Sequence, residues 1–221
     1  VDDAIFESDE TVILTLSNPS NASLGTNSIH TYTITDNDAP LPIVSTSSPT
    51  AILSTSATLN GFLADNGSTI TERGFVYSTT VASADPISGN TGVSTLIVSG
   101  TVGPFNATVT GLSLATEYTY KAYAKNATGI SYGTPLTFTT LAIPTITFAN
   151  IDKTYGDANF NLAATSNSGG EITYSIVAGG GTGIASLSGA NNKTVTLGNV
   201  GTVTIRATVA ANGSFASGTK D

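Results

Sequence analysis

The feature that most constrains this chain is an alternation of apolar and polar residues with a period of two. Because successive side chains of a strand point to opposite faces, the alternation predicts strands with one face in a core. No segment of ten or more residues repeats with the period of about 3.6 that is typical of a helix. Turns rich in Gly, Asn, Pro and Ser separate the segments, so the sequence predicts an all-β chain of tandem antiparallel β-sandwiches. The predicted strands are 11–17, 29–35, 57–63, 70–78, 93–99, 105–111, 117–125, 136–140, 145–151, 160–165, 171–177, 193–197 and 202–209.

The composition fits folded strands and excludes several classes of partner. Hydrophobic residues make up 39% of the 221 residues and charged residues 10%, which favours packed cores over disorder. The net charge of −8 argues against nucleic acid or an anionic membrane as an electrostatic partner. Cys is absent, which excludes disulfides and leaves the redox compartment undecided. No apolar run reaches the length of about 18 residues that a membrane span needs, so we expect no membrane insertion by this segment.

Two proline-bearing breaks, at 39–42 and 141–144, divide the chain. Each proline fixes φ and biases its predecessor toward extended backbone, which predicts short, stiff junctions. We therefore expect units at 1–40, 43–141 and 144–221. The first unit carries only two predicted strands, too few for a stable core, and the sequence does not begin with Met. We expect the first and last units to be truncated and the chain to be a fragment.

An acidic cluster brackets the two strands of the first unit. Asp3, Glu7 and Glu10 precede the first strand, and Asp36 and Asp38 follow the second. In an antiparallel pair the start of one strand lies beside the end of the next, so we expect these carboxylates at one pole. Calcium takes about six to eight oxygen ligands, and crowded carboxylates repel one another unless a cation or water intervenes. The alternative is that these acids solvate an exposed loop end.

The acidic spacing is followed by the strand TVILTLS, the loop NPSNASLG and a strand ending in Asp36-Asn37-Asp38. Together these motifs resemble the C-terminal half of a Calx-β domain, a calcium-binding sandwich of sodium–calcium exchangers, integrin β4 and large bacterial surface proteins. The resemblance covers residues 1–38 and implies that the five acids of the cluster coordinate Ca²⁺. Ala4 and Asn37 stand where some members have further acids, which implies fewer ions or weaker binding.

The motif LSLATEYTYKAYAKN at 112–126 and the strand GTPLTFTT at 133–140 are the main features of the second unit. Residues 43–141 resemble a fibronectin type III-like domain of bacterial extracellular proteins. The resemblance places Tyr118 at a tyrosine corner, where the ring packs in the core and the hydroxyl bonds to upstream backbone. Alternation directs Tyr118, Tyr120, Ala122 and Ala124 to one face and leaves Thr119, Lys121, Tyr123 and Lys125 on the other.

Several short motifs characterise the third unit: ITF at 146–148, KTYGD at 153–157, FNL at 160–162, ITYS at 172–175 and GTVTI at 201–205. They resemble a bacterial Ig-like module of the MBG type, which would cover 144–221. A closing strand is expected to begin where the chain stops, so the last strand of this module is expected to be missing. The glycine-rich GGGTG lacks the Lys and the following helix of a phosphate loop, which favours a hairpin loop.

These features favour a non-catalytic protein. The one histidine, His30, lies in an alternating strand, and no G-x-S-x-G motif occurs. Glu7, Glu10 and Asp38 could serve glycoside hydrolysis only beside an aromatic-walled cleft, which the acidic unit lacks. We therefore expect an adhesin-like stalk or spacer of a secreted or surface-anchored bacterial protein, with calcium at the Calx-β pole.

Two alternatives stay open. The chain could be an accessory carbohydrate-binding or spacer region of a secreted hydrolase, with Tyr123 and Tyr132 as the candidate exposed aromatic pair; the absence of Trp counts against it. It could also bind a host protein by strand addition at a sheet edge. The expected partners are an unidentified host or cell-surface protein or glycan, and neighbouring domains of the parent chain.

Overall fold

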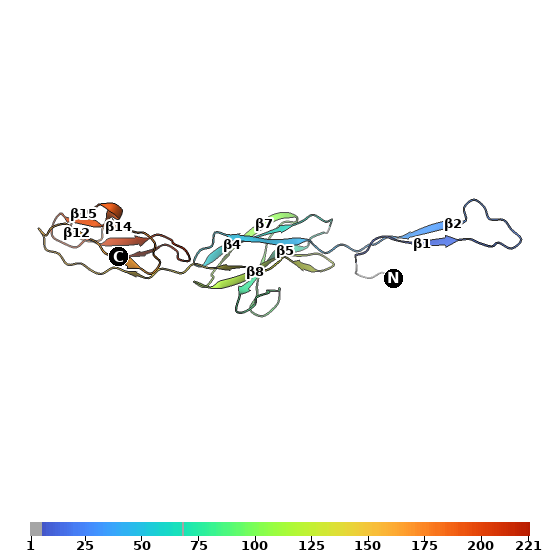
Figure 1. Cartoon of the computed structure of the whole chain (residues 1–221), viewed down its shortest axis with the longest axis horizontal. Helices are drawn as coiled ribbons and strands as arrows, with labels where there is room; N and C mark the ends of the chain where they lie inside the picture. The colour runs from blue at the N-terminus through green and yellow to red at the C-terminus, as the bar shows by residue number, and fades with distance from the viewer. Residues whose placement is uncertain (1–5, 68) are drawn as a thin grey trace.

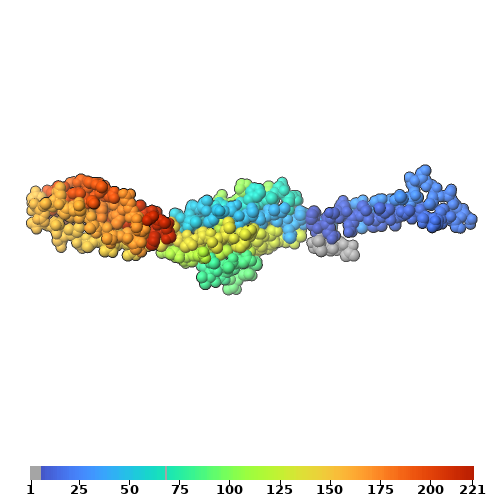
Figure 2. Space-filling view, in the orientation of Figure 1, coloured from blue at the N-terminus to red at the C-terminus, as the bar shows by residue number. Residues whose placement is uncertain are grey.

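The computed structural model describes residues 6–67 and 69–221 and confirms the all-β prediction. Within these residues all ladders are antiparallel, and the one helical element is a single 3-10 turn, Ala190–Asn192. Figures 1 and 2 show an elongated molecule in which three bodies follow one another along the long axis in chain order. In the described part of the chain, no helix is long and apolar enough to cross a membrane.

The first body is a lone hairpin. Strands β1 (Glu10–Thr15) and β2 (Ile29–Ile34) pair antiparallel and form a two-stranded sheet of their own. Both faces of the hairpin bear apolar side chains, and among the described residues no second sheet covers them, so they are exposed. A hairpin without a covering layer has no core and is marginal in water. The exposed large apolar residues of this hairpin and its loop are Val12, Ile13, Leu14, Leu16, Leu24, Ile29, Tyr32 and Ile34.

The second body is a sandwich of two sheets. One sheet has the order β3-β4-β7, and the other has the order β10-β8-β5-β6, with β9 also paired to β8. The β8 strand occupies a central place in its sheet and is the longest strand of this unit. The strands are β3 (Val44–Thr50), β4 (Ser56–Leu63), β5 (Glu72–Thr79), β6 (Ser94–Ile97), β7 (Gly103–Thr110), β8 (Glu117–Lys125), β9 (Ile130–Tyr132) and β10 (Leu136–Thr139).

The core of this sandwich follows the predicted alternation. Tyr118, Tyr120, Ala122 and Ala124 of β8 all lie in the buried cluster between the sheets. The Tyr118 ring stacks on Phe138, with 5.6 Å between ring centroids. Its hydroxyl accepts a hydrogen bond of 2.9 Å from the backbone N–H five residues upstream, which confirms the predicted tyrosine corner.

The third body also has two principal sheets, β12-β16-β15 and β14-β17-β18, with a short extra pair, β11-β13. Its buried centre consists of Leu162, Tyr174, Val195 and Ala207. The Tyr174 hydroxyl accepts a 2.8 Å bond from the backbone N–H of Ala164, much as the tyrosine corner does in the second unit. The strands are β11 (Ile146–Thr147), β12 (Phe160–Asn161), β13 (Thr165–Ser166), β14 (Ile172–Ile176), β15 (Ala185–Ser188), β16 (Thr194–Leu197), β17 (Ile205–Val209) and β18 (Gly218–Lys220).

Candidate metal centre and unit junctions

Asp36 joins the two segments that flank the first hairpin. Its Oδ2 accepts the backbone N–H of Glu7 at 2.6 Å, and its Oδ1 accepts the backbone N–H of Asp38 at 3.0 Å. Its own N–H donates to Asp9 Oδ1 at 3.1 Å. The segment before β1 and the segment after β2 therefore meet at one pole, where Glu10 begins β1 opposite Ile34.

The sequence prediction thus placed most of these acids at the correct end of the hairpin. Glu7, Glu10, Asp36 and Asp38 occur there, while Asp3 lies outside the described residues. Sequence reasoning missed Asp9, because it followed the family's acidic spacing, which passes over that position. The signal that could have found Asp9 is its place directly before the first strand, where a side chain can bond to the neighbouring segment.

The pole is strongly acidic. Residues 1–40 contain seven of the chain's 15 Asp and Glu residues and none of its seven Lys and Arg residues. Repulsion among these carboxylates is partly offset because Asp36 accepts two backbone N–H groups, one from Asp38 in the local pattern usual for Asp and one from the distant Glu7. Within residues 6–67 and 69–221, no three Asp, Glu or His side chains are grouped so that they could hold a metal ion. The described acids therefore do not by themselves fit a calcium centre.

The junction between the first and second units is bound along its length. Three successive backbone carbonyls accept hydrogen bonds from side chains of the second unit. Thr128 Oγ1 donates to the carbonyl of residue 39, Asn126 Nδ2 to that of residue 40, and Asn66 Nδ2 to that of residue 41, at 2.7, 2.7 and 2.8 Å. Asn126 is only 2% exposed, and Pro42 is also buried. The linker is therefore part of the second unit's surface.

In the junction between the second and third units, one residue is hydrogen-bonded to the second unit and the next residue to the third unit. The N–H of Leu141 donates to the carbonyl of Leu53 in the second unit at 3.1 Å. The N–H of Ala142 donates to Ser214 in the third unit at 2.8 Å, and the Ala142 carbonyl accepts from Ala216 at 2.8 Å. No residue lies between the two attachments. This junction has no free length over which the units could separate.

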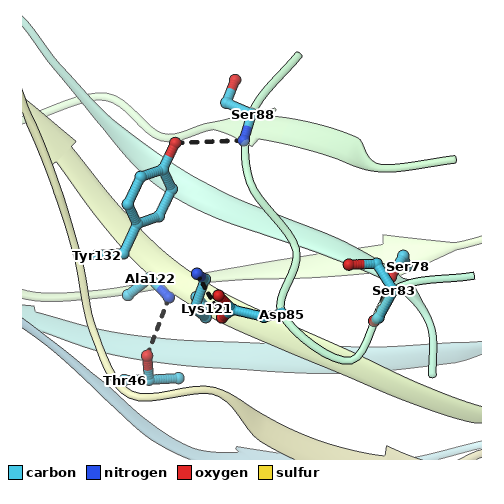
Figure 3. A network of polar contacts seen from close by, with 8 residues as sticks. All are labelled: Thr46, Ser78, Ser83, Asp85, Ser88, Lys121, Ala122 and Tyr132. Carbon is cyan, nitrogen blue, oxygen red and sulfur yellow. Dashed lines mark hydrogen bonds and ion pairs between the residues drawn. The ribbon is translucent and has the colours of Figure 1, made fainter. Parts of the chain in front are cut away.

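The outer face of β8, which alternation assigned to water, is covered except at its end, where Lys125 is exposed. Thr119, Lys121 and Tyr123 are 1%, 5% and 1% exposed. The connection between β5 and β6 passes over this face, as Figure 3 shows around Asp85 and Ser88. A sheet face that alternation assigns to water is buried here because a long loop folds back onto it.

Polar contacts hold that loop in place. Lys121 Nζ lies 2.7 Å from Asp85 Oδ1 and 4.6 Å from the centroid of the Tyr132 ring. The Tyr132 hydroxyl accepts the backbone N–H of Ser88 at 3.2 Å (Figure 3). The Lys121 stem is thus buried while its ammonium is paired with a carboxylate and an aromatic face.

The candidate carbohydrate platform is therefore absent as an exposed surface. Tyr123 and Tyr132 lie side by side, with ring centroids 6.2 Å apart, but Tyr123 is buried. Its hydroxyl donates to Glu72 Oε1 at 2.5 Å. Burial, together with the nearby Glu72 carboxylate, raises the pKa of Tyr123. The expectation that this pair is exposed was wrong for Tyr123, whose ring belongs to the packed interior, while Tyr132 is half-buried.

Arg73 performs a structural role beside the same sheet. Its guanidinium is largely buried and donates to the carbonyls of Ser99 and Thr101 at 2.8 and 2.5 Å. The charge also lies 4.8 Å from the centroid of Phe105. Burial lowers the pKa of Arg73. The side chain fixes the loop that leads from β6 into β7.

Comparisons with known proteins assign no family. No family model matches the chain, and no curated protein matches it. Among solved structures, it is similar to the sensor domain of the anti-sigma factor RsgI4 of Pseudobacteroides cellulosolvens. A short form is 19% identical over 48% of this chain and 100% of that one, with a TM-score of 0.36. A longer form is 17% identical over 50% and 100%, with a TM-score of 0.37. These scores are too low to carry an argument about function.

Proposed function

We propose that this chain is a non-catalytic stalk or spacer segment of a bacterial extracellular multidomain protein, with an adhesin-like role. The observation that carries the proposal is the attachment of both junctions. Carbonyls 39–41 are bound by second-unit side chains, and residues 141 and 142 are bound to successive units. A linker whose backbone is fixed to the bodies it joins transmits their orientation, whereas a free linker behaves as a flexible coil.

The architecture suits this role. The units follow one another in a line (Figures 1 and 2), so the length of the segment is close to the sum of its parts. The two-sheet arrangement and the tyrosine corner support the interpretation of 43–141 as fibronectin type III-like. The buried Tyr123 removes the feature on which the carbohydrate-binding alternative depended.

Distance measurements between spin labels test the stalk proposal. The chain has no cysteine, so pairs of introduced cysteines can be labelled uniquely. We expect a single narrow distance distribution for Thr33→Cys, an exposed position of β2 near the junction, with Val81→Cys, and another for Val81→Cys with Val200→Cys. Val81 and Val200 are highly exposed, so the labels should not disturb packing. Broad distributions in the otherwise unchanged protein would show that the units move independently and would reject a stalk.

Variants of the first junction sharpen this test. Thr128→Val with Asn66→Ala removes two of the three side-chain donors to the linker. We expect the first distribution to broaden and the second to stay unchanged. Asn60→Ala is the matched control, since its amide donates to the carbonyl of Ser48 inside the second unit. Equal broadening by the control would mean that the linker bonds do not set the orientation.

We propose calcium binding at the acidic pole as a separate addition to this role. The support is that the two segments carrying Glu7, Asp9, Asp36 and Asp38 are bonded to each other at one pole, and binding would need further oxygen ligands such as Asp3, which is not among the described residues. Extracellular calcium modules bind in the range of about 0.1–1 mM. We expect saturable shifts of the Glu7 and Asp38 amide signals in this range, lost in Asp38→Asn and kept in Asp157→Asn. A response that is absent, or equal for both variants, removes calcium and leaves the stalk proposal intact.

A further inference from the structure

The dipeptide Asn66-Gly67 lies in the loop after β4, at the junction between the first and second units. The Asn66 side-chain amide donates to the carbonyl of Leu41 at 2.8 Å, so it is part of the contact that fixes the linker. Gly67 has a φ of 79°, and nothing lies within 4 Å of the position where a Cβ would stand. A backbone nitrogen reaches the side-chain carbonyl carbon of a preceding asparagine most easily when it belongs to glycine, because no side chain obstructs the approach.

A carboxylate is bonded to the nitrogen that would make this attack. The backbone N–H of Gly67 donates to Asp65 Oδ1 at 3.2 Å. A general base must lie within hydrogen-bonding reach of the proton that it removes, and Asp65 meets this condition. Asp65 and Gly67 are both exposed, so water also reaches the loop. The nucleophile, the base and the amide that would be lost therefore lie on three successive residues.

The third unit contains a nearly identical segment without this carboxylate. Residues 64–68 are Ala-Asp-Asn-Gly-Ser and residues 210–214 are Ala-Ala-Asn-Gly-Ser, so the two segments differ at one position. The side-chain amide of Asn212 also donates to a distant backbone carbonyl, that of Ser168, at 3.0 Å. Asn212 and Phe215 exchange two backbone hydrogen bonds of 3.1 and 3.0 Å, which oppose the backbone rotation that an attack requires. The two segments provide a comparison within one molecule.

We propose that Asn66 is a site of spontaneous deamidation assisted by Asp65. The backbone nitrogen of Gly67 forms a bond to Cγ of Asn66 while Asp65 removes the N–H proton. The bond between Cγ and Nδ2 then breaks, and ammonia leaves with that proton. Water opens the resulting cyclic imide at either carbonyl, which leaves aspartate or isoaspartate at position 66. Water is the only co-reactant of this sequence.

The product changes the first junction. A carboxylate accepts hydrogen bonds and cannot donate them, so the Leu41 carbonyl loses the donor that Asn66 supplies. The Leu41 oxygen then lies beside a negative charge, which repels it. Deamidation therefore weakens the attachment of the linker to the second unit. The modification itself is independent of the stalk function, and only this consequence for the junction rests on it.

Peptide mapping of the whole chain during incubation at neutral pH tests the modification. Mass spectrometry detects the replacement of the amide by a carboxyl group, and isoaspartyl methyltransferase labels the isoaspartate. We expect position 66 to react at least about threefold faster than position 212, because only position 66 has the assisting base. Asp65→Ala makes the two segments identical in sequence and should slow position 66 by a similar factor. Asp157→Ala is the matched control, since Asp157 also accepts a local backbone N–H, and it should change neither rate.

Several results would overturn the proposal. These are equal rates at positions 66 and 212, an unchanged rate at 66 in Asp65→Ala, or no reaction at 66. The difference between the two positions should disappear in urea, and a difference that persists there would reflect sequence alone and reject the assignment to the folded loop.

The variant Asn66→Asp tests the consequence for the junction separately. It should broaden the distance distribution between spin labels at Thr33→Cys and Val81→Cys. A distribution that stays narrow in Asn66→Asp removes the effect on the junction, whereas a distribution that is already broad in the unmodified protein rejects the stalk proposal.

Discussion

The second and third units use the same local device but differ in closure. Each has a buried tyrosine whose hydroxyl accepts an upstream backbone N–H, Tyr118 from Ser113 and Tyr174 from Ala164. The second unit buries a continuous core of twelve residues, whereas the third buries four and keeps a cleft of about 460 Å³. A tyrosine corner therefore orients strands but does not close a sandwich.

How tightly the two sheets of a unit enclose their core depends on the number of residues paired in each strand ladder. In the second unit, β4 and β7 pair over eight residues, from Ser56 opposite Thr110 to Leu63 opposite Gly103, and β5 and β8 pair over eight. In the third unit, β12 and β16 pair over two residues, and β17 and β18 pair over three. Short ladders fix fewer side chains against the facing sheet, so less apolar surface leaves water.

Truncation of a leucine in each unit should give the largest contrast. Leu59 is fully buried in the second core, so Leu59→Ala should lower the free energy of unfolding of that unit by about 2–5 kcal/mol. Leu197 is half-buried on the open cleft, and Leu197→Ala should cost about 1 kcal/mol or less, because part of its surface already lies against a void. Urea unfolding followed by NMR signals of each unit measures both values. Equal losses would mean that the cleft is closed in solution.

Sequence reasoning predicted the fold best where the alternation is strong. The β8 strand was predicted with its observed bounds, 117–125, because tyrosines and alanines mark one face clearly. The β3 strand, VSTSSPT, was missed, since it has almost no apolar alternation and owes its place to pairing with β4. The predicted strand 145–151 shrinks to two residues, because only Ile146 and Thr147 find a partner strand.

The candidate site was predictable only in part. The convergence of acids at one pole follows from hairpin topology, which a sequence can indicate. The bonds that Asp36 makes to two backbone N–H groups depend on turn geometry, and the burial of Tyr123 depends on a loop that is distant in sequence. Neither the Asp36 bonds nor the burial of Tyr123 leaves a recognisable pattern in the neighbouring sequence. The linker bonds of Asn66, Asn126 and Thr128 likewise join positions that are far apart in the chain.

The covered face of β8 gives the second contrast, between the two partners of one ion pair. The Lys121 side chain is 6% exposed and that of Asp85 is 66% exposed. Asp85→Ala leaves a buried ammonium without its carboxylate and should cost about 1–3 kcal/mol of unfolding free energy. Lys121→Met keeps the buried stem and returns Asp85 to water, so it should cost less than about 1 kcal/mol. Thermal unfolding of both variants checks this order, and a larger loss for Lys121→Met would mean that the charge itself holds the loop.

Alkaline pH should destabilise the second unit through its interior tyrosines. Burial raises the pKa of Tyr120 and of Tyr123, the latter also through its bond to Glu72. A group with a raised folded pKa contributes stability that is complete below the unfolded value, about 10 for tyrosine, and is lost as pH rises above it, because only the unfolded state releases the proton. At pH 11 the loss should be on the order of 1 kcal/mol for each tyrosine relative to pH 9. Denaturant unfolding at the two pH values measures this loss of unfolding free energy.

Tyr123→Phe should remove about half of this pH dependence, whereas Tyr155→Phe, at a residue that is 60% exposed in the third unit, should leave it unchanged. If the full alkaline loss persists in Tyr123→Phe, the hydroxyl of Tyr123 is not one of its sources.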